Sequence, residues 1–255
     1  MKRCFAELHN SLSELAFRAG NSVGFTMVNV EQYDGYSVQR MGREREPLVV
    51  IDDFFADPSL LVNDASKKTF LASPNGYPGL RANAPSQYLL EKGELLSKIL
   101  ALVFGYTRRA DLMECNYSLV TTHPEHLHPV QRMPHYDGCD EYRIALLHYL
   151  CGPEKGGTSH YRHVSTGFET VRTHRRDTYL EALNAEEKQD GPPPASYFDG
   201  THPRFETIAR TEAKFNKVIM YRGTMIHSGD IPKDFSFAED AIDGRLTVNS
   251  LFVQG

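Results

Sequence analysis

The sequence predicts a mainly β domain of the α+β class, with the architecture of an antiparallel β-sandwich or jelly roll supported by N-terminal helices. Two observations predict it. Helical patterns come early in the chain, and from about Leu112 the pattern changes to many short strands separated by turns. The length of 255 residues suits a single domain with a sizeable core, so we expect one domain over 1–255.

The first part of the chain is expected to form an extension over residues 1–46, with one or two short strands. Leucine and alanine recur at helical spacing over residues 9–19, which predicts a short amphipathic helix there. Residues 47–55 form an apolar run rich in β-branched side chains, which predicts a buried strand.

Two supporting helices are expected within residues 47–110. The first begins near Pro58, because proline is favoured in the first turn of a helix, and continues to about Phe70. The second covers 94–104, where apolar residues recur at helical spacing. Residues 73–86 lie between them and are dense in proline and glycine, so they are expected to form a loop.

Residues 111–253 are expected to form the jelly-roll core. Within this range, 164–213 is expected to be an insertion that contains a helix over 176–188. The expected strands are 113–121, 142–151, 156–161, 217–221 and 245–253.

The composition excludes some partners. The formal net charge is −5 and the two signs are interspersed, which argues against a nucleic-acid partner. No apolar run approaches the roughly 20 residues that cross a membrane, and polar residues soon after Met1 argue against a signal peptide. The four cysteines are scattered, as is typical of reduced thiols. We therefore expect a cytoplasmic protein.

The segment Pro134–Gly138 carries the first candidate metal ligands. His135 and Asp137 lie two residues apart, so on an extended backbone both side chains point to the same side. His227 follows an apolar strand and is the best candidate for a third ligand. Two histidines and one carboxylate form the facial triad of non-haem Fe(II) oxygenases, which leaves metal positions open. A His-x-Asp pair alone also occurs by chance, as ordinary surface residues.

The last expected strand carries a candidate anion site. Alternation places Leu246, Val248 and Phe252 on one face and Arg245, Thr247 and Asn249 on the other. Arg245 offers a bidentate fork to a carboxylate, and the Thr247 hydroxyl is a further donor. A solvated strand face is the alternative interpretation of the same pattern.

Taken together, four motifs resemble the Fe(II)- and 2-oxoglutarate-dependent dioxygenase superfamily, and most closely its prolyl-hydroxylase-like branch. The resemblance covers residues 47–253, although only the motifs are specific. The motifs are Pro134-His135-Tyr136-Asp137-Gly138, Gly156-Gly157-Thr158, Met225-Ile226-His227 and Arg245-Leu246-Thr247.

The resemblance implies a double-stranded β-helix and makes His135, Asp137 and His227 the Fe(II) ligands. It implies that Arg245, assisted by Thr247, pairs with the distal carboxylate of 2-oxoglutarate. Arg245 lies further from His227 than is usual, and residues 232–244 are expected to form a surface loop between them.

Tyr117 is a further candidate for binding 2-oxoglutarate or substrate. No catalytic residue beyond the metal ligands is expected. The implied reaction uses O2 and most often hydroxylates a substrate, which here is an unidentified small molecule or peptidyl residue.

Two other functions remain open. One is a cupin-like metalloenzyme that does not use 2-oxoglutarate, and the other is a jelly-roll binding module without catalytic activity. The histidine-rich segment 123–129 is a candidate second metal site, but its two prolines favour a polar lid beside the active-site mouth.

Overall fold

The computed structural model describes residues 30–73 and 76–255, and the helix expected over 9–19 lies outside them. Within these described residues, three α-helices and five short 3₁₀ helices accompany the strands. The α-helices are α1 (Ser59–Ala65), α2 (Gly93–Leu102) and α3 (Arg176–Asp190). The 3₁₀ helices are η1 (Ser86–Lys92), η2 (Pro124–His126), η3 (Pro129–Arg132), η4 (Pro153–Lys155) and η5 (Thr173–Arg175). The strands are β1 (Val30–Tyr33), β2 (Tyr36–Met41), β3 (Glu46–Ile51), β4 (Leu71–Ala72), β5 (Gly79–Asn83), β6 (Ala110–Val120), β7 (Ile144–Tyr149), β8 (Gly157–His163), β9 (Phe205–Glu212), β10 (Lys217–Arg222), β11 (His227–Asp230) and β12 (Thr247–Gln254).

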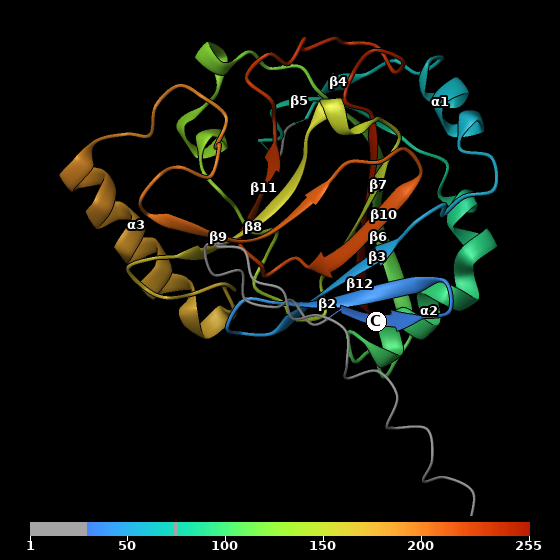
Figure 1. Ribbon diagram of the computed structural model, residues 1–255, viewed down its shortest axis with the longest axis horizontal. Coiled ribbons are helices and arrows are strands. Elements are labelled where there is room, and N and C mark those ends of the chain that lie inside the picture. Colours follow the sequence, from blue (N-terminus) through green and yellow to red (C-terminus); the bar gives the residue numbers. More distant parts are fainter. Residues whose placement is uncertain (1–29, 74–75) are drawn as a thin grey trace, which may run out of the picture.

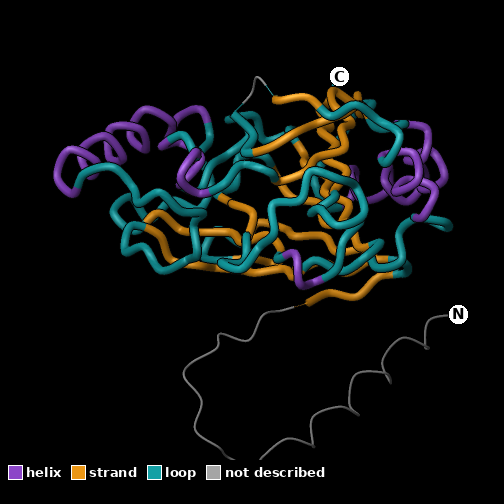
Figure 2. The backbone as a smooth tube through the Cα atoms, turned by 90° about the horizontal axis from the view of Figure 1, so that it is seen from above, coloured by secondary structure: helices purple, strands orange, loops and turns teal. Residues whose placement is uncertain are grey.

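The strands form two antiparallel sheets of a jelly roll, as expected. The large sheet has the order β1-β2-β3-β10-β7-β12-β6-β5-β4, and the small sheet has the order β11-β8-β9. Strands distant in sequence therefore become neighbours. Figure 1 shows the two sheets between helices α1 and α2 on one side and α3 on the other, and Figure 2 shows the same arrangement from above.

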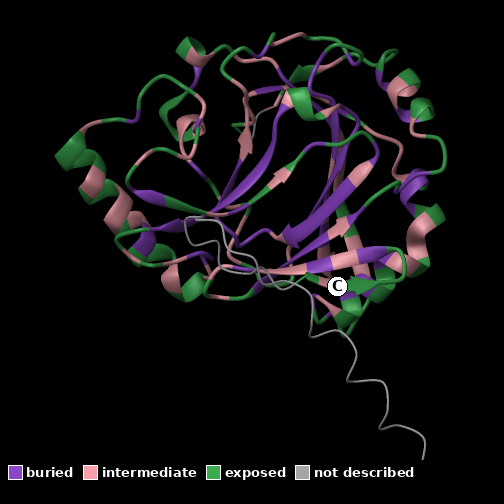
Figure 3. Ribbon diagram, in the orientation of Figure 1, coloured by how far each residue is buried: buried purple, intermediate pink, exposed green. Residues whose placement is uncertain are grey.

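The outer face of the large sheet is covered by the N-terminal helices. Their buried residues, such as Leu61 of α1 and Ile99 of α2, join one hydrophobic cluster with Val218 and Val248 of the sheet. Burial of this apolar face stabilises the supporting helices, since short helices gain most of their stability from packing. In Figure 3 the buried residues follow the central strands, and exposed residues lie on the outer helix faces.

The inner face of the large sheet packs against the small sheet. Leu147, Ile219 and Tyr221 of the large sheet share a second hydrophobic cluster with Ala209 of β9. Side chains alternate along each strand, so the same strands that fill the outer core also present residues to the space between the sheets. That space is where the polar residues of interest lie.

Three segments differ from the sequence-based expectation or refine it. The expected loop 73–86 contains strand β5, which pairs with β6. The expected insertion 164–213 contains α3, but its last part is strand β9 of the small sheet. The N-terminal extension supplies β1 and β2, which lengthen the large sheet. Within the described residues, no helix has the length and apolar character needed to cross a membrane.

Candidate metal centre

The backbone brings the three expected metal ligands together. His227 is the first residue of β11, and His135 pairs with it through an isolated antiparallel bridge. Asp137 is held two residues further on, where its amide donates to the carbonyl of Gly223 at 2.7 Å. Gly223 in turn donates its amide to the carbonyl of Arg143 at 2.7 Å. The ligands thus sit on a hydrogen-bonded edge between the two sheets.

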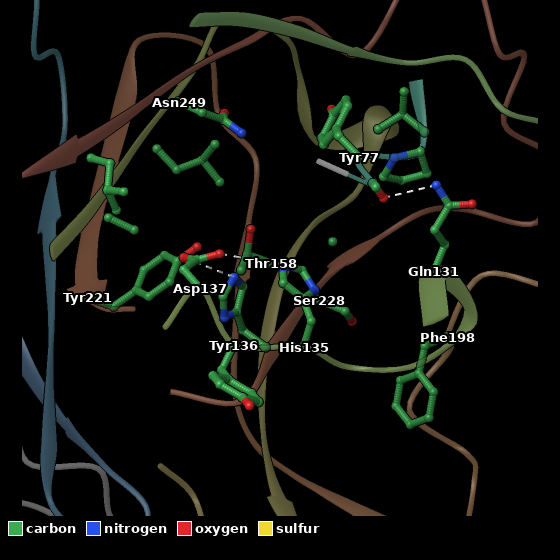
Figure 4. A pocket seen from close by; sticks show the side chains of 18 of the residues that line it. Tyr77, Gln131, His135, Tyr136, Asp137, Thr158, Phe198, Tyr221, Ser228 and Asn249 are labelled. Atoms are coloured by element: carbon green, nitrogen blue, oxygen red, sulfur yellow. Dashed lines mark hydrogen bonds and ion pairs between the residues drawn. The ribbon is translucent and has the colours of Figure 1, made fainter. Parts of the chain in front are cut away.

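The side chains of His135, Asp137 and His227 converge on one point. One ligand atom from each lies within 4.8 Å of the others. The Nε2 atoms of His135 and His227 each lie 3.8 Å from a different oxygen of the Asp137 carboxylate. These separations are too long for hydrogen bonds, but they leave room for an ion with bonds of about 2.0 to 2.2 Å. Figure 4 shows His135 and Asp137 directed toward each other in the cavity.

The tautomer of His227 is set by its backbone. Its Nδ1 lies 2.9 Å from the carbonyl oxygen of Met225, and a carbonyl only accepts, so Nδ1–H is the donor. The lone pair is then on Nε2, which faces Asp137. A second hydrogen bond of this kind is a regular feature of metal-binding histidines because it fixes the ring orientation.

The imidazole of His135 is held in its neutral form. Burial and, to a smaller extent, the neighbouring His227 lower its pKa to about 4, and Asp137 opposes this effect. Although 56% of the His135 side chain is accessible, it lines the cavity between the sheets. A neutral imidazole is the form that binds metal, so no proton has to leave His135 at neutral pH.

His160 lies behind His227 on the neighbouring strand β8. It is fully buried, and its ring packs against Tyr221 and His227 with centroids 4.8 and 6.0 Å apart. Burial lowers its pKa to about 3. It does not join the group of converging ligand atoms, so its role here is to support the His227 ring by packing.

The three ligands line a cavity of about 570 Å³. This volume is in the usual range for small-molecule sites. Its walls come from both sheets and from the segments 76–81 and 130–137, and they combine apolar side chains with a few convergent polar groups. In Figure 4, Thr158, Tyr221 and Asn249 are seen around the ligands.

Arg245 lies in the wall of this cavity, just before β12. It is 4% exposed, its Nη2 donates to the carbonyl of Gly157 at 2.7 Å, and its guanidinium lies 5.8 Å from the Tyr149 ring centroid. Its Nε is buried without a hydrogen-bond partner among the described residues. A buried cation with an unused donor is costly unless an anion completes the site.

The glycine pair before Thr158 forms the turn into β8, as expected. Gly156 has φ 98°, and a Cβ there would lie 1.8 Å from the carbonyl oxygen of Asp230. Only glycine fits that backbone conformation and that close approach. Thr158 then reaches the cavity wall, where its hydroxyl shares a hydrogen bond of 2.7 Å with the hydroxyl of Tyr149.

Thr247 lies on the inner face of the large sheet beside this wall. It is fully buried, and its hydroxyl donates to the side-chain oxygen of Asn249 at 2.9 Å. Asn249 lines the cavity, whereas Thr247 does not line it directly. Thr247 can therefore act on the cavity only through Asn249.

Tyr117 lies on the other face of the sheet, and the structure does not bring it into the site. Its partner on β12 is Val248, and both side chains join the outer hydrophobic cluster under the helices. Its hydroxyl donates to Asp64 of α1 at 3.1 Å. The physical reason is strand alternation, because residues opposite each other on neighbouring strands point to the same face.

Two cavity residues were not singled out from the sequence, Tyr77 and Arg81. The Tyr77 hydroxyl is buried without a hydrogen-bond partner in the described structure, as is the Nε of Arg81. Burial raises the pKa of Tyr77, and the nearby charges of Arg245 and Arg81 oppose that rise. The prolines and glycines around Tyr77 and Arg81 predict a loop and so hid strand β5. Once the strand Gly79–Asn83 is known, side-chain alternation places Arg81 on the inner face of the sheet.

The histidine-rich segment 123–129 does not gather ligands. Among residues 30–73 and 76–255, the one group of histidine, cysteine and carboxylate side chains close enough to hold an ion is His135, Asp137 and His227. His123 instead packs against Phe237 of the loop before β12, with ring centroids 4.6 Å apart. Phe237 also stacks on Tyr197, which lines the cavity. These aromatic contacts join three loops beside the cavity.

Comparison with known proteins adds a family and several structures. A family model described as "Family of unknown function (DUF6445)" matches residues 34–252. No curated protein sequence matches the chain significantly. The chain is similar in structure to HygX from Streptomyces hygroscopicus with nickel and 2-oxoglutarate bound, at 12% identity and a TM-score of 0.48, over 83% of this chain and 84% of HygX.

Two further structures are similar at the same level. The non-haem alpha-ketoglutarate-dependent carbocyclase SnoK from nogalamycin biosynthesis is 10% identical, with a TM-score of 0.49, over 83% of this chain and 81% of SnoK. EctD from S. alaskensis with bound Fe is 12% identical, with a TM-score of 0.39, over 89% of this chain and 80% of EctD. At such identities no residue role can be carried over to this chain.

Proposed function

The chain belongs to the DUF6445 family, and from its own site residues we propose that it is an Fe(II)- and 2-oxoglutarate-dependent oxygenase. The observation that carries the proposal is the convergence of His135, Asp137 and His227 within one cavity that also holds a buried arginine. Within this superfamily we propose the prolyl-hydroxylase-like branch, on the resemblance of the four motifs alone.

The donor set fits Fe(II). Two imidazole nitrogens and one carboxylate oxygen converge, and all three residues line the cavity. Cysteine and a fourth protein ligand, which a structural zinc site would use, are absent from the described group. Bound there, iron would supply O2 activation coupled to the decarboxylation of 2-oxoglutarate to succinate and CO2.

Arg245 is the group that would bind the distal carboxylate of 2-oxoglutarate. Its Nε is buried and has no hydrogen-bond partner among the described residues, and the same is true of the Tyr77 hydroxyl. Tyr77 lies close enough for the charge of Arg245 to oppose the rise of its pKa. A guanidinium and a hydroxyl can together satisfy a carboxylate through charge-assisted hydrogen bonds. Thr247 would then support the cavity wall through its hydrogen bond to Asn249.

The chain itself orients the reaction and limits the access of water. The backbone bridge fixes the two imidazoles, and the hydrogen bond from His227 to Met225 fixes which nitrogen faces the metal. The apolar wall residues Leu147, Phe198 and Met133 restrict solvent around the reacting groups. A preorganised, partly dry cavity strengthens each of these electrostatic interactions.

The test is calorimetric titration of 2-oxoglutarate into the protein loaded with Mn(II), which replaces Fe(II) without turnover. We expect metal-dependent binding, weakened about 10- to 100-fold in Arg245→Gln by loss of a charged hydrogen bond. Arg40→Gln, on the surface of β2, is the matched control and should bind normally. If 2-oxoglutarate fails to bind the metal-loaded protein, a metalloenzyme that does not use it becomes the better explanation.

A further inference from the structure

The cavity contains a second guanidinium whose position suggests a ligand other than 2-oxoglutarate. We propose, on the basis of the function proposed above, that Arg81 and Glu114 bind the carboxylate and the amine of a small zwitterionic substrate. The substrate class is therefore a free amino acid or a close derivative.

Arg81 is oriented but incompletely paired. Its guanidinium lies 4.5 Å from the ring centroid of Tyr77, which holds the planar group in place. Its Nη1 is 3.7 Å from the nearest Glu114 oxygen, beyond hydrogen-bond length, and its Nε is buried without a partner in the described residues. A carboxylate could therefore take up donor positions that no protein group occupies.

Arg81 and Glu114 line the same cavity as the metal ligands. Glu114 is opposite Leu251 on β12, and Leu251 is opposite Ala145 on β7. Ala145 is in turn opposite Tyr221, whose ring lies 4.8 Å from that of His227. This register places Glu114 across the cavity from the convergence point.

Arg245 lines the same cavity but has other protein partners. It precedes Thr247, which is opposite Tyr149 on β7, four positions further along that strand than Ala145. Its hydrogen bond to Gly157 holds it there. The backbone of Arg81 lies at the same level, because Arg81 pairs with Ser118 and Ser118 pairs with Thr247. Its guanidinium, however, lies 3.7 Å from Glu114, four positions along β6 from Ser118, whereas that of Arg245 donates to Gly157. The two guanidinium groups thus have different protein partners, and they suit two ligands in one cavity.

The charge balance at Arg81 favours a zwitterion. Arg81 and Glu114 carry opposite charges, so a ligand with only a carboxylate would face the Glu114 charge as well. A ligand with an amine beside its carboxylate pairs with both groups. Asn249 adds a polar contact, because its oxygen accepts from Thr247 and its amide nitrogen is turned toward the cavity in Figure 4.

The size of the cavity favours a free small molecule over a peptide. About 570 Å³ must accommodate 2-oxoglutarate together with the substrate. The apolar wall residues Val120, Met133 and Phe198 are available for the substrate side chain. An amino acid with an apolar or mixed side chain meets these conditions.

The experiment measures binding of the standard L-amino acids to the Mn(II)-loaded protein by calorimetry, with and without 2-oxoglutarate. Each amino acid that binds is compared with its α-amide, which lacks the carboxylate, and with its N-acetyl derivative, which lacks the charged amine. We expect at least one amino acid to bind, and both derivatives to bind at least about tenfold more weakly.

Two variants test which protein group binds the carboxylate of the amino acid and which binds its amine. In Arg81→Gln the amino acid and its amide should bind equally, and in Glu114→Gln the amino acid and its N-acetyl derivative should bind equally. Arg109→Gln, an exposed arginine paired with Asp111 near the start of β6, is the matched control and should retain full discrimination. Unchanged discrimination in both cavity variants would overturn the proposal.

Two other results would also overturn it. The first is the absence of binding by every amino acid. The second is a loss of 2-oxoglutarate affinity in Arg81→Gln equal to that in Arg245→Gln, which would assign Arg81 to the co-substrate. A failure of the proposed function is separate, because it would appear as absent 2-oxoglutarate binding by the unmodified protein, whatever amino acids bind.

Discussion

His135 and His227 are hydrogen-bonded to each other twice through the backbone. The amide of each donates to the carbonyl of the other at 2.8 Å, and their imidazole centroids lie 4.3 Å apart. A pair of residues far apart in sequence is thereby fixed as rigidly as neighbours in a β-ladder. The two nitrogen ligands are therefore positioned by the fold itself, before any ion binds.

The first prediction concerns the ligands. His135→Ala and Asp137→Ala should each lower Mn(II) affinity by at least about 100-fold, because loss of a direct ligand costs more than loss of its supporting partner. The affinity is measured by calorimetry or by the electron paramagnetic resonance of free Mn(II). His126→Ala, an exposed histidine of segment 123–129, should bind Mn(II) normally. Full Mn(II) affinity in both ligand variants would contradict the assignment.

The second prediction concerns Gly223, which holds the Asp137 backbone. A Cβ there would lie 3.2 Å from the Asp137 Cβ and 3.1 Å from Cγ of Arg143, so Gly223→Ala must displace one of them. Because metal sites tolerate little displacement, Mn(II) affinity should fall about tenfold in a protein that remains folded.

Gly93→Ala is the control for that variant. Gly93 begins α2, and a Cβ added there would have no atom within 4 Å beyond its chain neighbours and its own helix backbone. Alanine there should leave Mn(II) affinity unchanged and leave the free energy of unfolding equal or slightly higher. Equal metal affinity in both glycine variants would show that the close approach of Gly223 to Asp137 does not position the ligand.

The third prediction separates Tyr117 from the site. Tyr117→Phe removes the hydroxyl that donates to Asp64, so the free energy of unfolding should fall by about 1 kcal/mol. The affinity for 2-oxoglutarate should not change, because this side chain lies on the outer face of the sheet. Denaturant unfolding and calorimetry measure the two effects. Weakened 2-oxoglutarate binding at unchanged stability would place Tyr117 back in the site.

The fourth prediction concerns pH and His148, which is fully buried beneath the helices. Its Nε2 lies 3.1 Å from the side-chain oxygen of Asn216, and burial lowers its pKa to about 4 from the ordinary 6.5. Above about pH 6.5 the histidine is neutral in both states. Between 6.5 and 4 the unfolded chain takes up the proton and the folded chain does not, so stability falls as the pH falls.

The full effect of this histidine is about 3 kcal/mol, reached near pH 4. His148→Gln keeps a donor for Asn216 and removes the titration, so its stability should decline less between pH 6.5 and 4. His126→Gln serves as the exposed control and should keep the original decline. Parallel stability curves for His148→Gln and the unmodified protein, measured by urea unfolding at each pH, would rule out this cause.

Much of the fold follows from local patterns. The β-branched run at 47–55, the helical spacing at 94–104 and the alternation at 245–253 each predicted an element that the structure contains. Strand β5 escaped prediction because Pro78 and Gly79 at its start are typical of a loop. Strand β9 was not predicted because its polar composition is typical of an insertion. Its place in the small sheet depends on pairing with β8, which is distant in sequence.

The candidate site was less accessible to sequence reasoning. His135 and Asp137 could be proposed from their spacing, whereas their approach to His227 depends on a long-range bridge. The face on which Tyr117 lies depends on strand register, which the sequence of one strand does not define. The position of Arg81 in the cavity wall depends on the pairing of β5 with β6, which the sequence did not predict.

The most direct test is a crystal structure of the protein with Mn(II) and 2-oxoglutarate, with manganese located by its anomalous scattering. The account predicts one anomalous peak bound by His135, Asp137 and His227, with 2-oxoglutarate chelating it and its distal carboxylate on Arg245. A peak held by other residues, or 2-oxoglutarate bound away from the metal, would contradict it.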